Sequence, residues 1–175
     1  MTASKKNRTR VSARAASLSG TVSSGAAKFA GKLLPPNKLP QANRAMIEQS
    51  LSVGMGRALG IRLKKLSRTR IDAEMPVTAN HLNRSGRVNG GVLMTFADLL
   101  GAMGTVANLP EGYRTTTLES KTNFFAAGEG DVLAATVVPL HIGRTTMVWQ
   151  TTIKNMNGTR VAIVTQTQIV IPRKT

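Results

Sequence analysis

HLNRSGRVNGGVLMTFADLLGAM, the stretch from His81 to Met103, decides the fold. It begins as a polar loop punctuated by glycine and continues as an apolar segment of helical length. A helix that is apolar nearly all round is enclosed by other structure in a globular chain. Its one charge, Asp98, is therefore unusual, because a buried carboxylate is costly unless it is paired, hydrogen-bonded or in contact with a cavity.

The composition bounds the class of protein. The chain has 175 residues, which is enough for one domain with a hydrophobic core and an additional segment. It lacks cysteine, which excludes disulfides, thiolate metal sites and a cysteine nucleophile. With only two histidines, we expect no metal site and no redox cofactor. No apolar run reaches the roughly 18 residues that a membrane-spanning helix needs.

The charge is large and unevenly distributed. The net charge is +16, and residues 1–47 contain Lys and Arg but no acidic residue. We therefore expect residues 1–38 to be a basic, disordered extension and residues 39–175 to be the folded domain. A cytoplasmic protein fits this composition. The alternatives for the extension are contact with a membrane or with nucleic acid, or an organelle-targeting peptide.

The hydrophobic periodicity predicts an α+β domain. Residues 39–59 fit one amphipathic helix, and residues 61–77 turn to the period of a strand. After the central helix, strands are expected at residues 115–125, 131–142, 145–154 and 161–171, joined as an antiparallel meander. Gly143-Arg144 and Asn157-Gly158 read as hairpin turns. One sheet and one long apolar helix pack best with the sheet curved around the helix.

The strand at residues 115–125 alternates between two predicted faces. One face carries Thr116, Leu118, Ser120, Thr122 and Phe124, and the other carries Thr117, Glu119, Lys121, Asn123 and Phe125. In the last strand, a shared face is expected for Val161, Ile163, Thr165, Thr167, Ile169 and Ile171.

The start of the central helix suggests chemistry. Free N–H groups at a helix N-terminus attract an oxygen that carries negative charge, and Gly90 lets a ligand approach the backbone closely. Asp98 lies about 12 Å further along the helix axis, so it cannot serve its own N-terminus. Two antiparallel copies related by a two-fold axis would bring each Asp98 near Gly90 of the other subunit. The carboxylate would then act as general base or nucleophile at a carbonyl carbon.

The residues from His81 to Gly91, followed by Ala97-Asp98, resemble the signature of a known family. This is the group of hotdog-fold acyl-CoA thioesterases that includes the PaaI-like and 4-hydroxybenzoyl-CoA thioesterases. The resemblance extends over about residues 45–171. It implies a hotdog fold, with a curved antiparallel sheet wrapped around one central helix. It also implies hydrolysis of an acyl-CoA to a free acid and coenzyme A, by a homodimer or a dimer of dimers.

The resemblance assigns roles to individual residues. Asp98 matches the catalytic carboxylate, Gly90 the backbone donor to the thioester oxygen, and Asn83 the loop amide that places water or the thioester. Thr117 matches a hydroxyl position on the strand that faces the site. Asn89 stands where the family usually has histidine, and an amide cannot take up a proton near neutral pH. We expect activity to survive, because the acid-base work is assigned to the carboxylate.

Coenzyme A is expected as part of the substrate rather than as a cofactor. Candidate contacts to it are Arg144, Gly143, Lys121 and Arg87, although scattered cations are usually a solvated surface. Asn89 also suits the capping of the helix start. The alternative function is a non-catalytic hotdog module that binds acyl-CoA or an anionic surface.

Overall fold

The computed structural model describes residues 39–173. The predicted extension at residues 1–38, with its expected contacts, lies outside this range. The elements in chain order are α1 (Gln41–Ser52), α2 (Gly54–Ala58), β1 (Arg62–Leu66), β2 (Ile71–Pro76), the 3-10 helix η1 (Ala79–His81), α3 (Gly90–Val106), β3 (Tyr113–Phe124), β4 (Val132–Ile142), β5 (Thr146–Asn155) and β6 (Arg160–Pro172). In residues 39–173, no helix is both long and apolar enough to cross a membrane.

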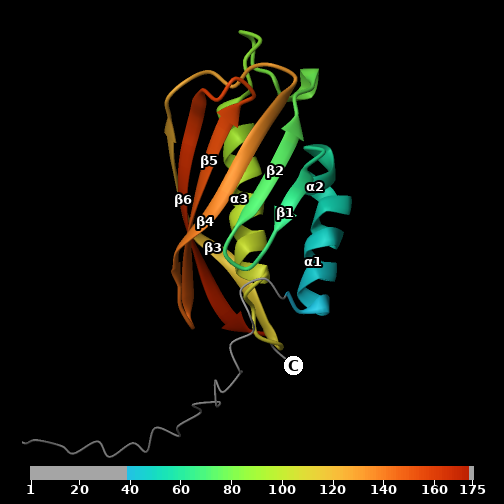
Figure 1. The fold of residues 1–175 in the computed structure, drawn as a ribbon, viewed down its shortest axis with the longest axis vertical. Helices are drawn as coiled ribbons and strands as arrows, with labels where there is room; N and C mark the ends of the chain where they lie inside the picture. Colours follow the sequence, from blue (N-terminus) through green and yellow to red (C-terminus); the bar gives the residue numbers. More distant parts are fainter. Residues whose placement is uncertain (1–38, 174–175) are drawn as a thin grey trace, which may run out of the picture. The chain divides into compact units, whose positions relative to one another are not determined.

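The six strands form one antiparallel sheet in the order β1-β2-β4-β5-β6-β3, with α3 lying along one face (Figure 1). α3 packs against β2, β3, β4, β5 and β6, and α1 and α2 also pack against it. These contacts confirm the prediction of an antiparallel sheet with one long helix packed on it.

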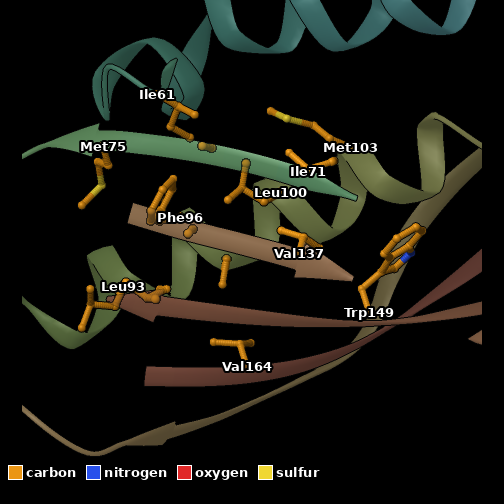
Figure 2. Close-up of a cluster of buried hydrophobic side chains, with 14 of the residues drawn as sticks. Ile61, Ile71, Met75, Leu93, Phe96, Leu100, Met103, Val137, Trp149 and Val164 are labelled. Carbon is orange, nitrogen blue, oxygen red and sulfur yellow. The ribbon is translucent and has the colours of Figure 1, made fainter. Parts of the chain in front are cut away.

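The core lies between α3 and the sheet. Leu93, Phe96 and Leu100 recur at helical spacing on α3 and are at most 2% exposed. They face Val137 and Trp149 from the strands (Figure 2). Burying side chains of this size stabilises the fold by about 1.5–3 kcal/mol each.

A glycine brings α3 close to the sheet. A Cβ atom on Gly104 would lie 2.9 Å from the Trp149 ring. The Trp149 Nε1–H donates to Thr105 Oγ1 at 2.8 Å, which satisfies the indole in the core. The small residue therefore sets the distance between helix and strand.

The prediction of one helix over residues 39–59 was wrong. Val53 has an extended backbone, with φ −130° and ψ 164°, and Gly54 follows with φ +52°. A Cβ atom on Gly56 would lie 2.1 Å from the Ser50 carbonyl oxygen, so α2 turns back tightly against the end of α1. The two glycines end the first helix and begin a second one.

The predicted strand at residues 61–77 is a hairpin of two strands. Ser67 closes the turn, because its N–H donates to the Arg70 carbonyl at 2.9 Å and its Oγ accepts from the Arg70 N–H at 2.9 Å. The predicted alternation is confirmed in β2, where Ile71, Ala73 and Met75 are buried.

The predicted meander was wrong for β3, which pairs with β6 at the sheet edge instead of with β4. β4 already has β2 and β5 on its two sides, so it offers no free edge. The link between β3 and β4 is held by Asn155, whose Nδ2–H donates to the Ala127 carbonyl and whose Oδ1 accepts from the Glu129 N–H. Sequence order therefore does not give strand order in this sheet.

β3 contains a bulge at Leu118. Thr117 pairs with Gln168 and Glu119 with Thr167, which leaves Leu118 without a partner. The predicted alternation is therefore wrong beyond the bulge. The hydroxyl oxygens of Ser120 and Thr122 are buried, and Thr117 turns its own hydroxyl toward α3. These three side chains share the inner face.

Candidate active site

Asp98 lies in the middle of α3, on the side turned away from the densest part of the core. Along this side Met94 is 40% exposed, and Thr95, Asp98 and Ala102 are half-buried. We expected α3 to be enclosed on all sides. Within one chain, only its sheet-facing side is buried. The carboxylate is not sealed in the interior.

One oxygen of Asp98 is fixed by two donors. Asp98 Oδ1 accepts from the Thr117 Oγ1–H at 3.0 Å and from the Gln166 Nε2–H at 2.7 Å. No hydrogen bond from the described residues reaches Oδ2. The carboxylate is therefore held on one side and keeps the other oxygen available to a ligand or to water.

The hydrogen bonds continue behind Thr117. Gln168 Nε2–H donates to Thr117 Oγ1 at 2.8 Å, and Gln168 Oε1 accepts from the Thr115 Oγ1–H at 2.8 Å. Because Gln168 donates to Thr117, the single hydroxyl proton of Thr117 is directed to Asp98. The sequence prediction placed Thr117 at the site, and the structure brings it into contact with Asp98.

Sequence reasoning missed both glutamines. Gln166 is 1% exposed and Gln168 is fully buried, on the face of β6 that packs against α3. Of the residues predicted to share a face, those from Ile163 to Ile171 do so on the half-buried outer side, whereas Val161 is buried in the core. The signal that could have located them is the presence of two glutamines, two residues apart, in a strand that is otherwise rich in β-branched residues.

The start of α3 has a free backbone donor. Asn89 Oδ1 accepts from the Gly91 N–H at 2.8 Å, so Asn89 caps the helix as expected. The Gly90 N–H donates to no acceptor among residues 39–173. The side chain nearest to Gly90 is the Phe124 ring, at 3.3 Å from the position of a Cβ atom.

The loop before α3 is held by side chains. Asn83 Oδ1 accepts from the N–H groups of Ser85 and Arg87 at 2.9 and 3.2 Å. Buried His81 accepts from the Thr78 N–H through Nδ1 at 3.3 Å. The Asn83 oxygen thus shapes the loop, while its NH2 group donates to none of the described residues.

The predicted contacts to coenzyme A are not brought together in one chain. Arg87 forms an ion pair with Glu129 near the start of β4. The Gly143-Arg144 turn follows the far end of β4 (Figure 1). Lys121 pairs with Thr165 and lies on the exposed outer side of β3. Within residues 39–173, no group of three metal-binding side chains gathers.

Comparisons with known proteins relate this chain to thioesterases. The family model described as the thioesterase superfamily matches residues 85–162. A Deinococcus radiodurans protein that is classed by name as an esterase is 31% identical over 127 residues, covering 71% of this chain and 79% of that protein. A proofreading thioesterase of Cronobacter turicensis is 29% identical, with coverage of 58% and 74%.

Solved structures share the fold. A variant of a Pseudomonas aeruginosa thioesterase has a TM-score of 0.69 and 26% identity, covering 74% of this chain and 94% of that one. A Streptococcus pneumoniae protein, described as a hypothetical thioesterase and solved with coenzyme A, has a TM-score of 0.59 and 28% identity, with coverage of 66% and 88%.

Proposed function

Because the chain belongs to the thioesterase superfamily, a family of thioester-hydrolysing enzymes, we propose that it hydrolyses an acyl-CoA thioester to a free acid and coenzyme A. Coenzyme A as the carrier is supported by the similar Streptococcus pneumoniae structure, which was solved with that molecule. The observation that carries the proposal is Asp98, with Oδ1 held by Thr117 and Gln166 and Oδ2 left available.

In the proposed reaction, Asp98 Oδ2 takes a proton from water while the water oxygen attacks the thioester carbonyl carbon. The new C–O bond moves negative charge onto the carbonyl oxygen, and the Gly90 N–H stabilises that charge. The C–S bond then breaks, and the coenzyme A thiolate takes the proton from Asp98. In the nucleophilic form of the mechanism, Oδ2 attacks the carbonyl carbon, the C–S bond breaks, and the coenzyme A thiolate leaves and takes a proton from solvent. Water then hydrolyses the resulting mixed anhydride, which releases the free acid and restores the Asp98 carboxylate.

The site is proposed to form between two subunits. Asp98 and Gly90 of one chain are separated by about 12 Å along the helix axis, which is too far for one carbonyl group to meet both. Exposed apolar side chains near this region support a partner surface, since Leu118 is 59%, Phe124 52% and Met94 40% exposed. An antiparallel pair of α3 helices would place Asp98 of one subunit near Gly90 of the other.

Thiol release from a panel of acyl-CoAs tests the proposed function. The panel contains phenylacetyl, benzoyl and short and medium straight-chain thioesters. We expect hydrolysis of at least one of them, and we expect Asp98→Ala to lower kcat by about 100- to 10,000-fold. Asp131→Ala is the matched control, because Asp131 is exposed in the loop before β4.

Undetectable hydrolysis across the panel, or equal rates for the wild type and Asp98→Ala, would contradict the proposed function. Acyl-CoA binding measured by calorimetry in the absence of hydrolysis would identify a binding module instead.

A further inference from the structure

We infer that Gln166 is a positioning residue for Asp98. Its amide holds the carboxylate so that Oδ2, rather than Oδ1, meets the water or the thioester. This role rests on the proposed function, since it concerns the same carboxylate. It adds a residue on β6 that does not touch the substrate.

The surroundings allow the Gln166 amide one orientation. Its Nε2 lies 2.7 Å from Asp98 Oδ1, 3.1 Å from the Asp98 carbonyl oxygen and 3.3 Å from Thr117 Oγ1. A carboxylate and a backbone carbonyl only accept hydrogen bonds. The reversed amide would set Oε1 against both of these acceptors, so Nε2 must face Asp98.

Stability alone does not account for an amide at this position. Gln166 is 1% exposed, and its Oε1 is buried without a hydrogen-bond partner in the described part of the chain. An unpaired buried carbonyl is unfavourable, and an apolar side chain of similar size would avoid that cost. The feature that requires the polar group is the contact with Asp98.

The helix also leaves space for this amide. Gly101 lies almost one turn after Asp98, and a Cβ atom there would be 2.2 Å from Gln166 Oε1. β6 is hydrogen-bonded to β5 on one side and to β3 on the other, which fixes the backbone that carries Gln166. Gln166 and Thr117 then hold the same oxygen from two strands.

The first test is Gln166→Leu, measured with the most rapidly hydrolysed acyl-CoA. We expect kcat to fall by about 10- to 100-fold, because a small displacement of a catalytic group costs up to that factor. KM should stay within about two-fold, because Gln166 makes no substrate contact. The unfolding temperature should not fall, since the unpaired Oε1 is removed. Gln150→Leu is the matched control, on the outer face of neighbouring β5.

The second test is Gln166→Glu, which places a second carboxylate beside Asp98. Two carboxylates at this distance share a proton, so the acidic limb of the kcat against pH profile should move to higher pH. An unmoved limb would show that the side chain at position 166 does not contact the carboxylate that titrates in the reaction.

The outcomes separate the two proposals. Full activity in Asp98→Ala overturns the proposed function. Loss of activity in Asp98→Ala, together with wild-type kcat in Gln166→Leu, overturns only the positioning role. An unmoved acidic limb in Gln166→Glu also counts against the positioning role, and it does so even if Gln166→Leu fails to fold.

Discussion

Gly90 contributes to the proposed site through its backbone alone, which makes a backbone substitution the sharpest test of its role. Gly90→Pro removes the N–H, and proline is well tolerated at the first position of a helix. Asn89, with φ −62° and ψ 138°, already has a conformation that suits the residue before proline. We expect kcat/KM to fall by about 100- to 1,000-fold, with little change in unfolding temperature.

Gly90→Ala is the matched control, because it keeps the N–H. Its Cβ atom would lie 3.3 Å from the Phe124 ring, and that ring is exposed enough to move aside. Equal kcat/KM values for the proline and alanine variants, measured by thiol release, would show that the amide is not used.

The site residues that could be predicted from the sequence are those with a recognisable local sequence context. Asp98 interrupts an apolar helix and Asn89 precedes its first turn, and both features can be read locally. Gln166 reaches Asp98 across 68 residues, so its partner depends on strand pairing and not on local spacing. Thr117 was found through the family resemblance, although the alternation assigned to its strand was wrong beyond Leu118.

Among the elements, the β1–β2 hairpin has a charge pair that links it to β4. Asp72 accepts from the Arg70 Nε–H and from the Thr136 Oγ1–H, both at 2.8 Å. Burial raises the pKa of Asp72, but the hydrogen bonds from Arg70 and Thr136 and the charge of Arg70 outweigh it and hold the pKa below its usual value. The ionised form of Asp72 therefore stabilises this part of the sheet.

Asp72→Asn should change how stability depends on pH. A carboxyl group with a lowered pKa in the folded state contributes stability above its unfolded value of about 3.9. That contribution is lost as the pH falls through the folded value. We expect the difference in unfolding temperature between wild type and Asp72→Asn to be largest near neutral pH and to vanish in strong acid. Asp131→Asn serves as the exposed control. A difference that persists unchanged into strong acid would contradict this account.

Element positions were predicted better than their connections. The four strands after α3 begin and end within two residues of their expected bounds, because alternation and turn residues are local properties. The break at Val53 and Gly54 and the turn at Ser67 were not predicted. Both depend on backbone angles and single side-chain hydrogen bonds, which periodicity does not report.

For the whole molecule, the central prediction is that each site uses two subunits. Asp98→Ala and Gly90→Pro homodimers should each be inactive. After the two are mixed under conditions that exchange subunits, half of the dimers carry one intact pair of Asp98 and Gly90. About a quarter of the wild-type activity per site should then return.

Two controls make the mixing experiment decisive. Each variant alone, taken through the same exchange, should stay inactive, and mass measurement of differently tagged chains should show that mixed dimers formed. Mixed dimers without recovered activity would mean that Asp98 and Gly90 of the same chain work together.

The unpaired Leu118 divides β3 into two halves of opposite parity. Before Leu118, the odd-numbered residues face α3, as Thr117 does. After Leu118, the even-numbered residues lie on that face, as Ser120 does. When a relative is aligned with this strand, a one-residue gap on the wrong side of Leu118 would transfer the assignment of Thr117 to a side chain on the opposite surface. When functional residues are transferred between relatives, the part of β3 before Leu118 and the part after it must therefore be aligned separately.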